Sequence, residues 1–478
     1  MKASNNPVPR QRGGDATPPY TVVATPTGRI FRVGESDKQI LGRSRASMVW
    51  LPWIAMMAIS VFEFGFGAAS KTLMARYGWG LSDTFWLASV WAVFQAGVAF
   101  PAGRLREKNI IRARTAMLLG AVLSGAGYIM LAHSGNIVVA IFGYSALGGI
   151  GSGLVYATCV NMVGKWYPER RGGKTGFVNG GFAYGAVPFI YLFSYGFTPG
   201  NYQLVLDAVG VYMLVVVGIC GLFFKDPPPN WWPRHIDPLA WAANAKSARS
   251  LAKNPPAVRQ YTPAEAIRTG MLPLMWVCLV IIGGVSLFGI NFQVPFAKAS
   301  HFGPFVAASS MGIMSVINGT GRGVVGWASD RLGRRQTLCL VLAIAGVAQF
   351  GVLWSGLTHS LPFFLVFAFV NGFSGGAFYP LFASLVPDYF GENNNAQNYG
   401  LVYSAKLVGG VGGVGLASLL VEAWGYTGTY ILAGLVAFLS AALVLLLRQP
   451  GHARAMTVTL TEAVVARRAT TEAAAEAR

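Results

Sequence analysis

Three ionisable residues stand deep inside long apolar stretches of this chain: Arg322, Lys406 and Glu63. A charged side chain in the hydrocarbon of a bilayer costs roughly 2.5 to 3.5 kcal/mol on insertion scales, unless it meets an opposite charge, a polar cavity or water. Residues of this kind therefore tend to mark binding sites or proton pathways. We take these three as the residues whose types and positions could carry chemistry.

Arg322 presents a planar guanidinium, which can hold a carboxylate through two parallel hydrogen bonds. Lys406 has apolar residues or glycine for about a turn on each side, so its side chain cannot easily extend to either face of a membrane. The two cations can bind one anion together. The alternative for each is a permanent structural ion pair with a residue on a neighbouring helix.

Glu63 lies in the aromatic segment VFEFGF. Burial among rings favours the neutral, protonated form of a carboxyl group unless a cation is near. Glu63 can therefore carry a proton, pair with Arg322 or Lys406, or simply face a neighbouring helix. With Glu63 ionised, the three groups hold one net positive charge, which suits a monoanion. With Glu63 protonated they hold two, which suits a dianion such as oxalate.

The elements that must position these residues are apolar segments long enough to cross a bilayer. The chain is 54% hydrophobic and 12% charged, with a mean hydropathy of +0.49. An apolar run of about 18 to 20 residues predicts a membrane helix, so we expect an all-α integral membrane protein with twelve transmembrane helices. The predicted helices span 48–70, 84–103, 113–133, 137–163, 175–197, 204–224, 272–296, 304–328, 336–356, 361–386, 398–421 and 427–447.

The loops predict the domain organisation and the orientation. Basic residues gather in alternate loops, at 104–114, 165–174 and 331–335, whereas the opposite loops carry few. Because Lys and Arg stay on the cytoplasmic side, we expect both termini to be cytoplasmic, although the loop 387–397 has no basic residue. The expected segments are an N-terminal tail at 1–47, a six-helix bundle at 48–224, a central linker at 225–270, a second bundle at 271–447 and a C-terminal tail at 448–478.

The chain repeats itself at an offset of half its length. The acids Glu107 and Asp330, each four residues after a glycine, are 223 positions apart, and so are Tyr156 and Tyr379. Such an offset indicates two parallel, pseudo-symmetric halves with a binding site between them near the membrane midplane. Tyr156 and Tyr379 are then expected to face each other across that site.

The segment after the helix expected at 304–328 resembles the loop signature of the major facilitator superfamily. Its residues are Gly326, Asp330, Arg331, Gly333, Arg334 and Arg335, and a degenerate first copy contains Gly103, Glu107 and Lys108. The segments NGTGRGVVGWASDRLGRR, GSGLVYATCVNMVGKWYPERRG and NYGLVYSAKLVGG resemble one branch of it, the oxalate:formate antiporter family. The resemblance implies the major facilitator fold and a charge latch at the cytoplasmic face, to which Asp330 contributes.

The same resemblance assigns roles within the membrane. It implies that Arg322 and Lys406 bind the substrate carboxylate. Aromatic residues of a surrounding cage would be Tyr156, Tyr379, Phe64 and Phe182. The family tends to have Tyr at the last two positions, and an uncharged polar residue where this chain has Glu63. Glu63 is thus a departure that bears on substrate charge and coupling.

These observations predict a secondary active transporter of small organic carboxylate anions, an oxalate/formate-like antiporter working by alternating access. A proton-coupled monocarboxylate symporter is the alternative. The histidines are dispersed and the four cysteines form no CxxC pair, so we expect neither an enzyme, nor a cofactor, nor a metal site. The net charge of +19 lies in loops and tails, which argues against nucleic-acid binding. We expect a monomer in a bacterial inner membrane, with the anion, a proton and lipid as its partners.

Overall fold

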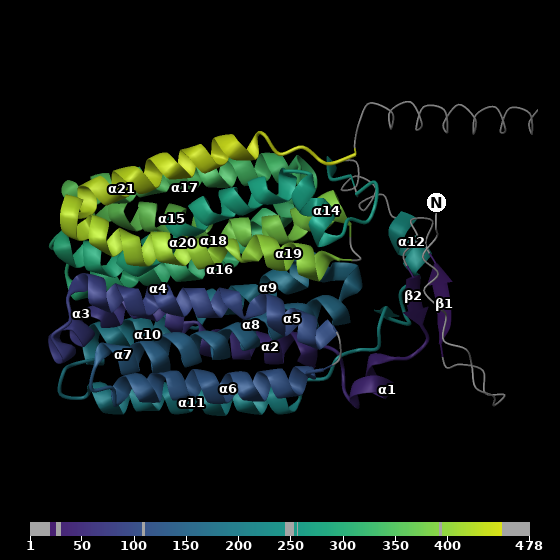
Figure 1. The fold of residues 1–478 in the computed structure, drawn as a ribbon, viewed down its shortest axis with the longest axis horizontal. Helices are drawn as coiled ribbons and strands as arrows, with labels where there is room; N and C mark the ends of the chain where they lie inside the picture. The colour runs from purple at the N-terminus through teal and green to yellow at the C-terminus, as the bar shows by residue number, and fades with distance from the viewer. Residues whose placement is uncertain are drawn as a thin grey trace, which may run out of the picture.

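The computed structural model describes residues 20–24, 30–107, 110–243, 253–255, 257–391 and 394–451. Two layers of long, roughly parallel helices lie side by side (Figure 1). Helices from residues 47–222 make one layer, the N-terminal half, and those from residues 271–444 make the other, the C-terminal half. The expected all-α membrane architecture is confirmed, whereas the domain boundaries proposed above stay predictions.

In the N-terminal half, several of the long helical rods consist of short helical elements that follow one another without a loop. Its elements are α2 (Ser47–Ile59), η1 (Val61–Gly65), α3 (Phe66–Tyr77), α4 (Leu81–Gly97), α5 (Ala99–Glu107), α6 (Ala113–Ala132), α7 (Ile137–Ala140), η2 (Ile141–Leu147), α8 (Gly148–Trp166), η3 (Pro168–Arg170), α9 (Arg171–Tyr184), α10 (Val187–Tyr191), η4 (Leu192–Gly196) and α11 (Tyr202–Leu222). The segments η1, η2 and η4 are turns of π-helix within these rods. Such turns change the direction in which side chains leave a helix and are frequent at functional sites.

The C-terminal half has longer uninterrupted helices. Its elements are α15 (Met271–Ala299), α16 (Pro304–Leu332), α17 (Arg334–Leu357), α18 (Leu361–Phe390), α19 (Asn395–Tyr403), α20 (Ala405–Gly410), the π-helical η5 (Val411–Leu416) and α21 (Ala417–Val444). Within α21, Gly425 is non-helical, with φ of 67° and ψ of 179°. This break falls between the two last predicted helices, 398–421 and 427–447.

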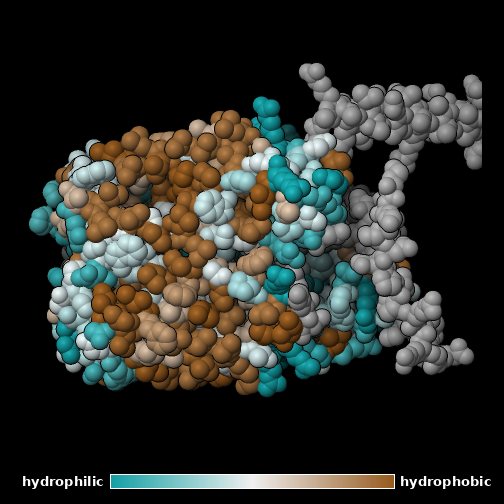
Figure 2. Space-filling model, viewed as in Figure 1, coloured by the Kyte–Doolittle hydropathy of each residue, from teal (hydrophilic) through white to brown (hydrophobic). Residues whose placement is uncertain are grey.

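Within the described residues, ten helical segments are long and apolar enough to cross a membrane. The last of them, Gln397–Val444, contains 48 residues and the break at Gly425, so it combines two predicted helices. The 29-residue α16, which carries Arg322, is not among the ten. The count of twelve therefore stays a prediction. Figure 2 shows the apolar belt that these helices present, between more polar ends.

The two halves approach closely where glycines remove side chains. A Cβ atom added to Gly67 of α3 would clash with the backbone oxygen of Asn291 in α15. A Cβ added to Gly319 of α16 would lie 2.8 Å from the backbone oxygen of Gly180 in α9. Small residues allow membrane helices to pack at this distance, as the glycine-rich segments of the sequence suggest.

A small three-stranded sheet lies outside the helical layers. Strand β1 (Thr21–Ala24) pairs antiparallel with β2 (Ile30–Val33), and β2 pairs in parallel with β3 (Trp231–Trp232) of the linker. Of the short helices at this end, α1 (Asp37–Leu41) follows β2 in the chain, α12 (Pro238–Ala243) follows β3, and α14 (Pro263–Arg268) packs against α15 and α19 of the C-terminal half. The N-terminal tail and the linker are therefore joined by backbone hydrogen bonds, which the sequence did not predict. We call this end of the molecule the linker end and the opposite one the far end.

Candidate functional site

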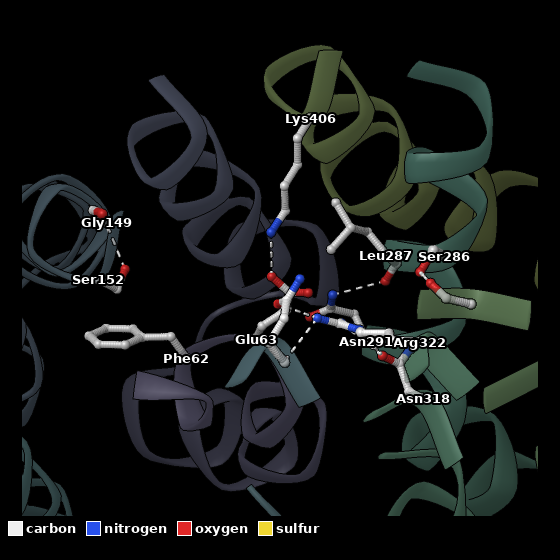
Figure 3. A network of polar contacts seen from close by, with 12 residues as sticks. Phe62, Glu63, Gly149, Ser152, Ser286, Leu287, Asn291, Asn318, Arg322 and Lys406 are labelled. Atoms are coloured by element: carbon white, nitrogen blue, oxygen red, sulfur yellow. Dashed lines mark hydrogen bonds and ion pairs between the residues drawn. The ribbon is translucent and has the colours of Figure 1, made fainter. Parts of the chain in front are cut away.

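Glu63 and Lys406 form an ion pair between the two halves of the molecule. The Nζ atom of Lys406 lies 2.6 Å from Oε2 of Glu63, and both side chains are almost fully buried, at 2% and 3% exposure (Figure 3). Glu63 comes from η1 and Lys406 from α20. Of the alternatives that the sequence left open for Glu63, the structure shows the pair with Lys406.

The π-helical turn η1 sets the position of Glu63. The backbone N–H groups of Glu63 and Phe64 both donate to the carbonyl oxygen of Ser60, at 3.1 and 3.0 Å. These bonds lie at the start of η1, and the π-helical turn that follows interrupts the regular helical register between α2 and α3. It is a feature of the backbone that apolar periodicity does not reveal, so the sequence located Glu63 but not its orientation.

Arg322 is bound by neutral groups only. Its Nη1 atom donates to Oδ1 of Asn179 at 2.6 Å and to the backbone oxygen of Asn179 at 3.1 Å. Its Nε and Nη2 atoms donate to Oδ1 of Asn318, at 3.2 and 2.8 Å. Arg322 takes part in no ion pair found among the described residues. The structural salt bridge considered as its alternative role is therefore not seen there.

A glycine on the neighbouring helix makes room for this arrangement. Gly376 of α18 faces Arg322, and a Cβ atom added there would lie 2.8 Å from Nε of Arg322 and would overlap Oδ1 of Asn318. Asn179 belongs to α9 in the N-terminal half, whereas Arg322 and Asn318 belong to α16. Arg322, like Lys406, is thus bonded across the interface between the halves.

Aromatic side chains enclose the two cations. The ring of Phe182 lies 5.4 Å from that of Tyr156 and 5.9 Å from that of Phe64, between centroids. Tyr156 and Tyr379 each contact Tyr403, at 5.8 and 6.0 Å. The structure thus brings all four predicted aromatic residues together. The sequence analysis missed Tyr403 as a site residue, although it stands three residues before Lys406, a spacing that would place both on one face of a continuous helix. In the structure Tyr403 ends α19 and Lys406 belongs to α20.

Each cation lies near the faces of these rings. The Nζ atom of Lys406 is 5.7, 5.8 and 5.9 Å from the ring centres of Trp91, Phe182 and Tyr379. The guanidinium carbon of Arg322 is 6.0 Å from the ring centre of Tyr379. Cations within about 6 Å of a ring centre are attracted by the electron density of its face. Trp91 of α4 is a further site residue that the sequence did not single out.

Three buried hydrogen-bond donors at this site have no partner within the described structure. They are Nε1 of Trp91, Nδ2 of Asn318 and the hydroxyl of Tyr379. Buried polar groups in proteins are nearly always paired. These three donors lie near the two cations, and a ligand rich in acceptor atoms, as a carboxylate is, could pair them.

The site is enclosed by contacts between the halves at both ends. At the far end, the backbone N–H of Ser82 donates to Oε1 of Glu422 at 3.0 Å. Towards the linker end, Phe100 lies against Gly400, where an added Cβ would be 3.1 Å from the ring. Tyr156, the most exposed residue of the site, is only 8% exposed. The structure thus represents a closed conformation, sealed from both sides.

The loop signature lies at the linker end, far from the cations. Arg334 pairs closely with Asp388 of α18, and its distance to Asp330 is longer, at 3.6 Å. Asp388 is an acid of the loop that lacked basic residues, and this pairing gives it a structural role. Gly333 has φ of 100°, a conformation that favours glycine.

The remaining residues of the loop signature have contacts of their own or belong to a segment that the structure does not fully describe. Arg331 stacks on Trp327 at 3.9 Å, and Nη1 of Arg335 donates to the backbone oxygen of Leu447 at 2.9 Å. A Cβ added to Gly103 or Gly326 would meet no atom within 4 Å. In the first copy, Lys108 lies outside the described residues, and the structure does not describe the side chain of Glu107. No group of three or more His, Cys, Asp or Glu residues that could hold a metal occurs in the described part of the chain.

Comparison with known proteins defines the family. The family profile of the Major Facilitator Superfamily matches residues 52–365 and 319–470, so the chain belongs to this superfamily of transporters. It is a multi-pass membrane transporter and not an enzyme.

Individual relatives are distant in sequence. The oxalate:formate antiporter of Oxalobacter formigenes is 23% identical over 390 residues, which is 82% of this chain and 88% of that protein. Monocarboxylate transporter 12 of Rattus norvegicus is 24% identical over 379 residues, covering 76% and 77% of the two chains. Among solved structures, a POT family transporter in complex with 5-aminolevulinic acid aligns with a TM-score of 0.62 at 15% identity, covering 86% of this chain and 97% of that one. At this identity the likeness concerns the fold alone.

Proposed function

We propose that this transporter carries a small monocarboxylate anion together with a proton, by alternating access. The observation that carries the proposal is the unequal compensation of the two cations. Lys406 is neutralised by Glu63 at 2.6 Å, whereas Arg322 has only amide and carbonyl oxygens as partners. The closed site thus has one uncompensated positive charge, which matches one carboxylate.

Arg322 is the proposed point of attachment. A carboxylate can take over the N–H donors that now bind Asn179, and it offers a charged acceptor in place of neutral ones. Hydrogen bonds to an ionised acceptor are roughly twice as strong as those between neutral groups. The unpaired Nδ2 of Asn318 and hydroxyl of Tyr379 would supply further donors to the bound anion.

Glu63 is the proposed proton carrier. In the empty, closed site it balances Lys406, while Arg322 keeps the neutral oxygens of Asn179 and Asn318 as its partners. When one proton reaches Glu63 and one monoanion reaches Arg322, the net charge of the site is the same as before loading. The site then has the same net charge when it changes conformation loaded and when it changes conformation empty. Electroneutral symport requires this equality.

A second candidate is exchange of oxalate and formate. The sequence motifs and the similarity to the oxalate:formate antiporter favour it. It requires a site that can accept a dianion, which Arg322 and Lys406 provide only while Glu63 is protonated. Similarity to monocarboxylate transporter 12, over a smaller share of both chains, supports a monocarboxylate as the substrate. The charge of the closed site decides our preference for the first candidate.

The orientation follows from the loop charges. We place the linker end on the cytoplasmic side of a bacterial inner membrane, since it carries the basic loops. The far end then faces outward, and the protein acts as a monomer with two six-helix halves as its moving parts.

The test uses purified protein in sealed proteoliposomes without ATP. Labelled formate, oxalate, lactate and pyruvate are offered with and without an inwardly directed proton gradient, and with a matched anion inside for counterflow. We expect a monocarboxylate to accumulate in response to the proton gradient. Counterflow of oxalate against formate with no response to the gradient would establish the second candidate instead. Absence of flux for all four anions would refute both.

A further inference from the structure

An apolar crevice opens between the two halves, away from the ion pair. It has a volume of about 790 Å³ and is lined by α10, α16 and α18. The lining includes Val187 and Tyr191 from the N-terminal half, and Gly312, Val316 and Phe369 from the C-terminal half. These residues lie in the parts of their helices nearer the far end.

The lining offers hydrocarbon and few free polar groups. The hydroxyls of Tyr191 and Ser309 are 3.1 Å apart and hydrogen-bond to each other across the crevice. The two hydroxyl groups are therefore partners of each other. The other lining residues are aliphatic, aromatic or glycine. A charged or strongly polar ligand would find no counterpart here, because burying an unpaired polar group is unfavourable.

The crevice is continuous with the lipid-facing surface. Val316, Val366 and Phe369 line it and are 41%, 52% and 48% exposed, respectively. Helix α18, which carries Val366 and Phe369, is long and apolar enough to cross the membrane that this transporter spans, and Val316 of α16 lies beside it. The molecules in contact with the apolar belt are lipids, and their chains have the chemistry of the lining.

We propose that this crevice binds one acyl chain of a phospholipid from the leaflet at the far end, and that the bound chain stabilises the closed conformation there. The reason is that the walls come from both halves, so the shape of the crevice depends on how the halves are positioned. A ligand that binds one arrangement better than another shifts the equilibrium towards it by its difference in affinity. The composition of the outer leaflet would thereby regulate the rate of transport.

Gly312 provides a way to fill the crevice without touching the ion-binding residues. A Cβ added there would lie 3.7 Å from the ring of Tyr191, an ordinary contact with no overlap. Gly312→Leu should therefore fold and exclude the acyl chain. Gly218→Leu on α11 is the matched control, since nothing lies within 4 Å of a Cβ at that position. Val316→Trp, one turn further along α16, is a second filling variant in case the first one fails to fold.

The experiment is photolabelling in nanodiscs with a phosphatidylcholine that carries a diazirine in one acyl chain, followed by mass spectrometry of the labelled peptides. We expect the α10 and α16 segments at the crevice to be labelled in excess over α11 in the wild type. Gly312→Leu or Val316→Trp should lose most of that excess, whereas Gly218→Leu should keep it. Uniform labelling of all lipid-facing helices would overturn the proposal, as would crosslinks from the crevice to a second copy of the chain.

A second measurement tests the conformational effect. Spin labels at Lys71 of α3 and Lys298 of α15, two helices of opposite halves that run towards the far end, report opening at the far end in a variant lacking the native cysteines. We expect the closed distance to be more populated in phospholipid nanodiscs than in a short-chain detergent, and this difference to shrink in Gly312→Leu. A population that is the same in both environments would refute the stabilising role, even if the chain binds.

Discussion

Replacing Glu63 by Gln tests whether the buried ion pair couples protons to transport. Lys406 and Glu63 are 2% and 3% exposed and 2.6 Å apart. Breaking a buried pair by removing one partner costs about 3 to 5 kcal/mol, because the other charge stays buried. The amide oxygen of Gln can still accept a hydrogen bond from Lys406, and hydrogen bonds to charged groups contribute about 1.5 to 3 kcal/mol. We therefore expect a folded protein, less stable by a few kcal/mol.

The same change alters anion selectivity. It raises the net charge of the site from one to two positive charges. For a ligand at roughly 6 Å in an effective dielectric of about 20, each extra unit charge contributes about 3 kcal/mol per ligand charge. A dianion gains twice as much as a monoanion, so the difference of about 3 kcal/mol corresponds to roughly a hundredfold shift towards oxalate over formate or lactate.

The assay is uptake by proteoliposomes with and without an imposed proton gradient, alongside anion competition for counterflow. Glu63→Gln should lose gradient-driven uptake, keep anion exchange, and shift its preference towards oxalate. Glu265→Gln in the linker is the matched control, because it removes a carboxylate from the exposed helix α14 and leaves the site intact. If Glu63→Gln responds to the gradient and selects anions as the wild type does, Glu63 has only a packing role and the proposed coupling is wrong.

Further predictions concern the other cation, its neighbour and the loop latch. Arg322→Lys should lose most transport in well-inserted protein, because an ammonium group cannot bind a carboxylate in two parallel hydrogen bonds; near-normal flux would contradict its role. Gly376→Ala should weaken anion binding, measured by tryptophan fluorescence titration, because the added methyl group overlaps Oδ1 of Asn318 and displaces the guanidinium. Asp388→Asn should slow exchange more than it weakens equilibrium binding, since Asp388 holds Arg334 at the linker end; equal losses in both measurements would count against a gating role.

The helices and the buried charged residues of the site could be predicted from the sequence, because the bilayer acts as an apolar solvent that constrains both. A long apolar run must become a helix, and a charge inside it must have a reason to be there. Lys406, Arg322 and Glu63 were found in this way. The partners were harder to predict, because they depend on tertiary geometry. The pairing of Glu63 with Lys406 joins residues 343 positions apart and depends on the π-helical turn of η1.

The uncharged neighbours of the two cations and the short strand β3 left even weaker signals in the sequence. Asn179 is one polar residue in a glycine-rich helix, and its side chain and backbone together occupy one nitrogen of Arg322. Trp91 is an aromatic residue among many, and only its position near Lys406 distinguishes it. Strand β3 consists of two residues, Trp231 and Trp232, which is too short for periodicity to predict. These features are visible only once the chain is folded.

The proposed function assigns recognition to one cation and coupling to the other, although both cations bridge the two halves. Arg322 holds Asn179 by neutral hydrogen bonds, which an incoming carboxylate can replace with stronger ones. Lys406 holds a carboxylate already, so a substrate gains less by displacing Glu63 unless a proton has first neutralised it. An anion should therefore engage Arg322 at any protonation state, whereas release of Lys406 should depend on the proton. Under the proposed function, that order of events would make Arg322 the residue that selects the substrate, and the Glu63–Lys406 pair the element that makes its movement depend on pH.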